Sequence, residues 1–151
     1  YDGTSSTFTT SSTISLNTWT HIAIVRKGTG TNEFSIYIDG TAGVTGTMAT
    51  NFGADQLIVA RSFGTYGEWF TGHISNFRIV KGTAVYTGNF TPPTTPLTAI
   101  TNTVLLTCQS NRTVDNSASA HTETGGTPSE TAAFSPFLTS EVYASWTNGA
   151  R

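Results

Sequence analysis

The acidic residues are the first place to look for chemistry, because hydrolysis of a glycoside with retention needs two carboxylates about 5–5.5 Å apart. Residues i, i+2 and i+4 of a strand share one face, so such a pair is expected at short spacing. The nine acids are Asp2, Glu33, Asp39, Asp55, Glu68, Asp115, Glu123, Glu130 and Glu141. No two of them lie within five residues of each other inside an expected strand. We therefore predict no catalytic residue, although a pair formed across strands stays open.

The other groups that commonly carry catalysis are scattered as well. His21, His73 and His121 do not have the spacing of metal ligands, and the chain has no G-x-S-x-G nucleophile motif. The single cysteine, Cys108, lies in an apolar run and is expected to be a small buried hydrophobe. These observations predict a protein that is not an enzyme and needs no cofactor.

One loop has the composition of a sugar-binding surface. Arg61, Tyr66 and Trp69 lie among glycines, with Phe63 and Phe70 beside them. Aromatic rings stack on sugar rings, and arginine donates hydrogen bonds to hydroxyl groups. Arg61, Tyr66 and Trp69 are therefore the candidate glycan-binding residues. The alternative is that Trp69 and Phe70 close the end of a hydrophobic core, which is the more common fate of aromatic side chains.

Short β-strands are expected to position these residues. The strong strands are predicted at residues 19–26, 34–39, 69–80 and 103–108. Residues 19–26 have apolar side chains on both faces, as in the middle of a sandwich, and Asp39-Gly40 indicates a tight hairpin turn. In residues 69–80 the alternation slips near Ser75-Asn76, which predicts a bulge or a bend there.

Weaker elements are expected between the strong strands. Residues 1–16 are interpreted as one or two exposed strands, 41–50 as a short exposed strand and 57–60 as a buried strand. Residues 90–96 (FTPPTTP) form a connecting crossover, because proline donates no ladder hydrogen bond. The role of residues 138–151 stays open: they add a strand or reach a neighbouring molecule.

Composition supports an all-β class. Only 11% of the 151 residues are charged, and threonine, which favours strands, makes up about a fifth of the chain. The net charge of −2 and the scattered basic residues argue against nucleic acid, and no apolar run is long enough for membrane insertion. Because the chain begins with Tyr1, we expect a processed product or, more readily, a piece of a longer polypeptide.

Three strings resemble a known family. They are NTWTHIAIVR (residues 17–26), FSIYIDG (34–40) and GHISNFRIVKGTAVYT (72–87), the last followed by NFTPP (89–93). The first two resemble the concanavalin A-like lectin/glucanase superfamily, in its laminin G-like jelly-roll branch. The third is similar to such domains in bacteriophage tail, fibre and structural proteins. The similarity extends over roughly residues 17–137.

The resemblance implies a fold and a set of alternatives for function. It implies an antiparallel two-sheet jelly-roll sandwich over residues 1–137. Residues 138–151 are then a C-terminal extension, for which contact with a neighbour is one of the two alternatives given above. Such domains usually have further strands before the tryptophan strand, so the sandwich is expected to lack its first strands. The clustered E-x-D-x-x-E acids of the glucanase branch are missing here. Some laminin G-like domains hold calcium, for which Asp55 and Asp115 are weak candidates, since calcium takes six to eight oxygens.

The leading functional hypothesis is a non-catalytic structural or adhesion module of a virion, such as a phage tail, fibre or capsid-decorating domain. Its expected partners are other virion proteins or copies of itself, in a homo-oligomer, with host-surface glycan as a further contact. The alternative is a lectin-like carbohydrate-binding domain at a bacterial cell surface or in the extracellular space.

Overall fold

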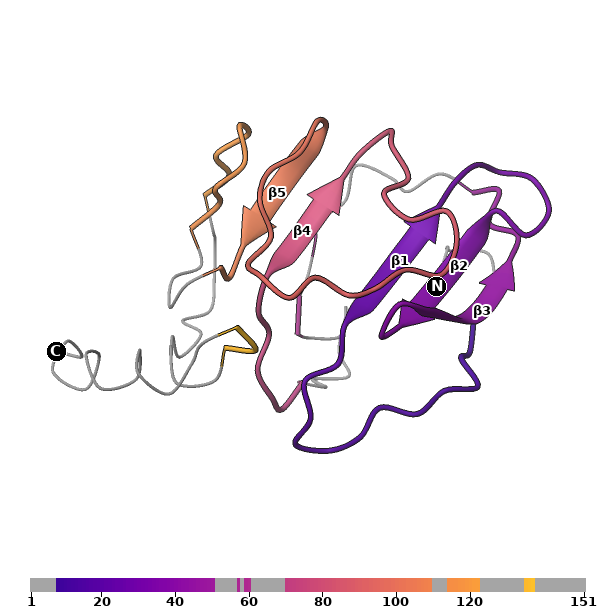
Figure 1. Ribbon diagram of the computed structural model, residues 1–151. Coiled ribbons are helices and arrows are strands. Elements are labelled where there is room, and N and C mark those ends of the chain that lie inside the picture. Colours follow the sequence, from indigo (N-terminus) through magenta and orange to yellow (C-terminus); the bar gives the residue numbers. More distant parts are fainter. Residues whose placement is uncertain are drawn as a thin grey trace, which may run out of the picture.

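The structure is a computed structural model of the 151-residue chain, and it describes residues 8–50, 57, 59–60, 70–109, 114–122 and 135–137. Five strands lie in these ranges: β1 (Ile22–Arg26), β2 (Phe34–Ile38), β3 (Thr41–Gly46), β4 (Phe77–Val80) and β5 (Thr103–Thr107) (Figure 1). No helix occurs in the described residues. The predicted all-β class, with antiparallel strands, is confirmed.

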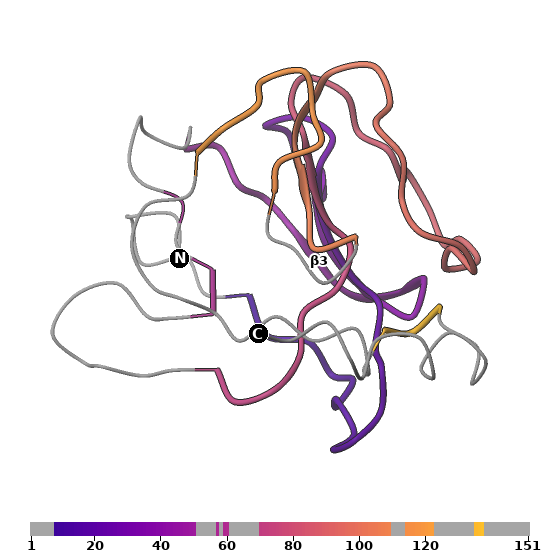
Figure 2. The ribbon, with the colours of Figure 1, turned by 90° about the vertical axis from the view of Figure 1, so that its left-hand side faces the viewer.

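The strands form two antiparallel sheets. One has the order β1-β2-β3, and the other pairs β4 with β5. Figure 1 shows β4 beside β1, and in the side view of Figure 2 both sheets overlap in one layer. The predicted crossover is confirmed, because residues 81–102 contain no strand and cross one side of this layer. That side is called the covered side below.

Local chemistry explains the best-formed hairpin. β2 and β3 are joined by Asp39 and Gly40, whose φ angles are +47° and +78°. Two consecutive positive φ values give a type I′ turn, whose twist matches that of the strands it joins. Phe34, Ile36 and Ile38 share one side of β2, while Ser35 and Tyr37 share the other, as the alternation predicted. The predicted hairpin is therefore confirmed.

Several predicted strands are shorter than expected or absent. Residues 8–16 contain no strand, and the strand predicted at 19–26 begins only at Ile22. The strand predicted at 69–80 begins at Phe77, directly after Asn76, whose positive φ of 54° breaks the extended backbone. The expected bend near Ser75-Asn76 is thus present, but it sets the start of the strand.

The buried strand predicted at residues 57–60 was wrong for its described members. Leu57 and Val59 are 57% and 42% exposed, and neither is in a strand. Cys108, expected to be buried, is only half-buried at the end of β5. Among the described residues, the buried apolar side chains are Val25, Phe34, Tyr37, Met48 and Leu106. They lie mainly on strands, because only there do facing apolar rows exclude water.

Candidate functional site

An aromatic cluster holds the crossover on the covered side. Tyr86 and Phe90 stack with ring centroids 3.5 Å apart, and the His21 ring meets both edge-on, at 6.2 Å and 5.5 Å. Tyr37 of β2 meets Phe90 at 5.5 Å and is only 2% exposed. Edge-to-face and stacked rings add to the energy of burial. The cluster therefore fixes the crossover to β1 and β2.

His21 also anchors the start of β1 through its backbone. Its N–H donates to Asp39 Oδ1 and its C=O accepts from Asp39 N–H, both at 2.8 Å. Burial lowers the pKa of the imidazole below 6.5, the Asp39 charge opposes this, and the Arg78 charge adds to it. Nδ1 is buried and has no hydrogen-bond partner among the described groups. This is the one feature of His21 that the local fold leaves unexplained.

Asp115 is buried and saturated with donors. Its Oδ1 accepts from the N–H groups of Leu106 and Ser117, at 3.0 Å and 2.9 Å. Its Oδ2 accepts from the Ser117 hydroxyl and from His121 N–H. Burial alone would raise the pKa of Asp115, but the three backbone bonds and the hydroxyl outweigh it and lower the pKa to about 2. Asp115 thus stays ionised as an internal support of β5.

The hydrogen bonds of the described carboxylates matter for two questions, calcium binding and catalysis. As a calcium ligand, Asp115 would have to give up protein donors, and Asp55 lies outside the described residues. In the described ranges, no three His, Cys, Asp or Glu side chains gather into a possible metal site. The remaining described acids, Glu33 and Asp39, accept from Gly30 N–H and His21 N–H respectively. Each described carboxylate thus has a local structural partner.

The predicted glycan-binding residues, Arg61, Tyr66 and Trp69, lie outside the described residues, as does Phe63. Their neighbour Phe70 is described and is 58% exposed. The alternative in which Phe70 closes the end of the core was therefore wrong for this residue. Phe70 N–H donates to Ala60 C=O at 2.9 Å, which joins the two ends of the loop. The prediction for these three residues therefore stays a prediction, and the structure leaves one adjacent aromatic ring at the surface.

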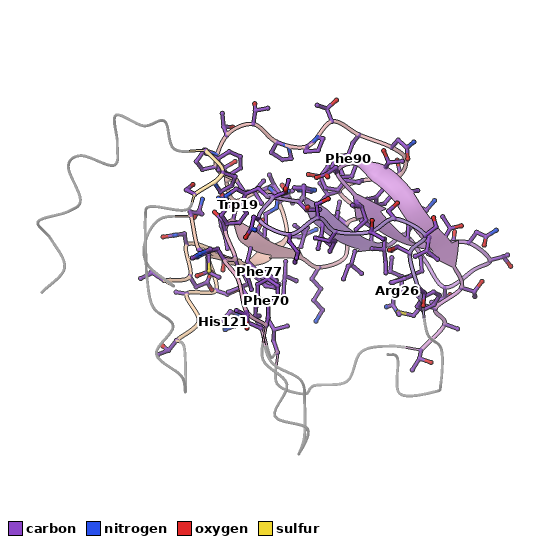
Figure 3. All side chains as sticks on the ribbon, turned by 90° about the horizontal axis from the view of Figure 1, so that it is seen from below. Trp19, Arg26, Phe70, Phe77, Phe90 and His121 are labelled. Atoms are coloured by element: carbon purple, nitrogen blue, oxygen red, sulfur yellow. The ribbon has the colours of Figure 1, made fainter. Side chains whose placement is uncertain are left out.

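The side of the layer opposite the crossover holds a feature that sequence reasoning missed. Ile22 and Ile24 of β1 are 50% and 67% exposed, whereas Val25 between them and Arg26 is buried. Figure 3 shows Phe90 on one side of the sheets, and Arg26, Phe77 and Phe70 on the other. Ile22 and Ile24 share the side of Arg26, because alternate residues of a strand share a face. This open side, with Ile22 and Ile24 on it, is the candidate interaction surface.

The prediction that β1 is buried on both faces was therefore wrong. Near β2 and β3 the open side is partly covered, since Phe8 packs on Phe34 with ring centroids 4.3 Å apart. Ile24, farther along β1, stays 67% exposed. The pattern of strand 19–26 did contain the signal, because apolar residues on both faces call for a second layer. Periodicity alone does not tell whether that layer is supplied within the chain.

Taken together, these features define an all-β module that offers a surface for binding. A family model of the laminin G type, described as the concanavalin A-like lectin/glucanases superfamily, matches residues 1–87. The chain belongs to this superfamily, whose domains of this kind bind carbohydrates or proteins. A search of curated proteins and a search of solved structures found no match. The described residues contain no helix that is long and apolar enough to cross a membrane.

Proposed function

We propose that this chain is a non-catalytic structural or adhesion module of a virion that works by packing against other protein surfaces. The exposure of Ile22 and Ile24 on an otherwise ordered strand is the observation that carries the proposal. Two isoleucine side chains exposed to water add no burial energy to the fold of a monomer. Apolar side chains that gather at the surface mark sites of protein contact. The low charge of the chain, 11% of residues, is compatible with close packing of copies.

A non-catalytic role has its own support. Each described carboxylate is engaged by backbone N–H groups of its neighbours. A general acid or base must instead be placed within reach of a substrate proton. The phage-like strings at residues 72–87 and 89–93 support a virion, and hence a partner among virion proteins or copies of the chain.

Sedimentation velocity of the purified chain over a range of concentrations tests the proposal. We expect association that weakens when Ile24 is replaced by serine, with the fold unchanged by circular dichroism. A chain that stays monomeric at all concentrations and binds no virion protein would contradict it.

The second candidate function is a lectin-like domain, supported by the exposed ring of Phe70 beside the predicted residues Tyr66 and Trp69. A glycan array separates the two functions. Micromolar binding that is lost in Tyr66→Ala or Trp69→Ala, with the fold intact, would favour the lectin. Retained association without glycan binding would favour the packing module.

A further inference from the structure

The outer edge of β1 carries backbone groups that point away from its own sheet. Asp39 N–H donates to His21 C=O at 2.8 Å, and Lys27 N–H donates to Glu33 C=O at 2.7 Å. In an antiparallel pair, hydrogen-bonded positions alternate with positions whose groups point outward. His21 and Lys27 therefore face β2, as do the two residues at even spacing between them. The N–H and C=O groups of Ile22 and Ile24 point to the other side, where no described strand pairs with β1.

That outward edge of β1 faces β4. Figure 1 shows the two strands beside each other and pointing the same way, and no ladder joins them. A strand placed between them would run antiparallel to both. It would have the crossover on one side and the exposed Ile22 and Ile24 on the other.

The basic residues beside this edge are four in the described part of the chain, and three of them lie toward one end. The described Lys and Arg residues all lie on, or directly after, β1 and β4: Arg26, Lys27, Arg78 and Lys81. Since β1 and β4 point the same way, Arg26, Lys27 and Lys81 are at the same end. An added antiparallel strand would begin there, so an acid near its N-terminal end fits best.

The opposite end of the edge also limits which side chains an added strand should carry. There, on the covered side, the buried Nδ1 of His21 has no described partner. A hydroxyl group suits either tautomer of the imidazole, because it can donate or accept. An added strand should therefore have apolar side chains on the Ile22 and Ile24 side, and hydroxyl side chains on the His21 side.

We propose that residues 138–147 of a second copy of this chain occupy the β1 edge as an added antiparallel strand. Their sequence, LTSEVYASWT, alternates as required: Val142, Ala144 and Trp146 share one face. The other face holds Thr139, Glu141, Tyr143, Ser145 and Thr147, one acid near the start and hydroxyl groups elsewhere. Ten extended residues span about 33 Å, which exceeds the length of the five-residue strand β1.

Charge and pattern select one register. With Glu141 opposite Lys27, Thr147 lies opposite His21, and Trp146 and Ala144 lie opposite Ile22 and Ile24. The apolar residues then meet on the open side, and the acid and hydroxyl groups meet on the covered side. No shift by one residue keeps this match, because it would exchange the two faces.

The direction of approach favours a second copy over the same molecule as the donor of the added strand. The described residues 135–137 lie at the level where β1 and β4 begin (Figures 1 and 2). A segment that enters from there would run parallel to β1, whereas a second molecule approaches in either direction. The contact is head-to-tail, so each copy gives one strand and receives one, and a ring or a filament results. This proposal rests on the proposed packing function and names its partner.

Two proline variants test the proposal by complementation. Ile24→Pro removes an outward N–H and blocks acceptance, but leaves the ladder between β1 and β2 intact. Val142→Pro blocks donation in the same way. We expect each variant alone to sediment as a monomer and their mixture to form a 1:1 dimer that grows no further. Wild-type chain should form larger assemblies, which an acetylated and amidated LTSEVYASWT peptide should disperse.

Control variants keep the test sharp. Val25→Pro removes an N–H that faces β2 and should unfold the chain, unlike Ile24→Pro, whose fold is checked by hydrogen exchange at Ala23 and Val25. Glu141→Lys should weaken peptide binding about two- to five-fold, as expected for one exposed charge pair. Lys27→Glu should restore binding of the Glu141→Lys peptide.

The remaining outcomes would overturn the proposal. Ile22 and Ile24 amides that resist exchange in monomeric chain would show an edge filled within the molecule. Association that survives Ile24→Pro would place the contact elsewhere, although the packing function would stand. A chain that never associates, with a peptide that does not bind, would remove both.

Discussion

The outer edges of β5 and β1 differ in how their backbone groups are satisfied. On β5, Leu106 N–H donates to Asp115 Oδ1 at 3.0 Å, and Leu106 C=O accepts from Asn116 N–H at 2.7 Å. A loop of the same chain thus satisfies this edge. On β1, the outward groups of Ile22 and Ile24 meet no described strand, and both side chains are half or more exposed.

The contrast shows that this fold covers a strand edge where a loop of the same chain supplies hydrogen-bonding groups. The edge of β3 is also protected, because Gly43 C=O accepts from Ser11 N–H and Ala42 N–H donates to Asn89 Oδ1. An exposed edge invites pairing with another chain, and proteins usually blunt or cover it. No described strand pairs with the β1 edge and β1 contains no proline, which is why we interpret it as a docking edge.

The largest expected effect concerns the covered side. Gly40 has a φ of +78°, and a Cβ there would overlap the carbonyl oxygen of Phe90. Gly40→Ala should lower the free energy of unfolding by about 3–4 kcal/mol, from backbone strain plus the clash. Gly82, with φ +84° and open space around it, is the matched control, and Gly82→Ala should cost about 1 kcal/mol. Urea unfolding measures both. Equal costs would mean that the crossover does not pack on the hairpin.

The closed edge of β5 should be nearly as sensitive. Asp115→Ala leaves buried N–H groups without acceptors and should cost about 3 kcal/mol. Ser117→Ala, which removes a single donor, should cost about 1 kcal/mol. The folded-state pKa of Asp115 lies below its ordinary value of 3.8, at about 2. Its stabilisation is therefore complete above pH about 4 and is lost as the pH falls toward 2. Acid unfolding that is unchanged in Asp115→Ala would contradict this.

Neighbouring residues of β1 offer a smaller and more direct comparison. Val25 is 8% exposed, and Val25→Ala should cost about 2 kcal/mol in the free energy of unfolding. Ile24 is 67% exposed, and Ile24→Ala in the dissociated chain should lower the free energy of unfolding by less than about 0.5 kcal/mol. Denaturation at low protein concentration measures both. A large cost for Ile24→Ala there would show that the open side is covered within one molecule.

The smallest effect should be the pH dependence due to His21. Burial lowers its pKa in the folded chain, so protonation favours the unfolded chain. This stabilisation is complete above the ordinary pKa of 6.5 and falls as the pH drops toward the lower folded-state pKa. His21→Phe keeps an aromatic ring but has no nitrogen to protonate, so it should remove this pH dependence. If strand docking satisfies Nδ1, association should also shift the midpoint, which a titration followed by NMR would detect.

Much of the fold could be predicted from local patterns. The alternation at residues 34–39 and the dipeptide Asp39-Gly40 encode β2 and its turn, because side-chain period and positive φ are local properties. The crossover at 90–96 follows from its prolines. Strand ends were predicted less well. The strand predicted at 69–80 begins only after Asn76, whose positive φ angle is supported by contacts with neighbouring segments. The predicted glycan-binding loop lies outside the described residues and stays a prediction.

The role of Asp115 shows where sequence reasoning stops. In the sequence it is an isolated acid, equally suited to a metal or to solvent, and its donors come partly from Leu106 in a separate strand. Likewise, the apolar residues on both faces of β1 indicate that both faces need cover. By itself, then, the sequence determined the all-β class, the hairpin and the lack of clustered acids, because these depend on near neighbours. Only the tertiary structure decided which edge is closed and which stays open, because each depends on segments that are distant in the chain.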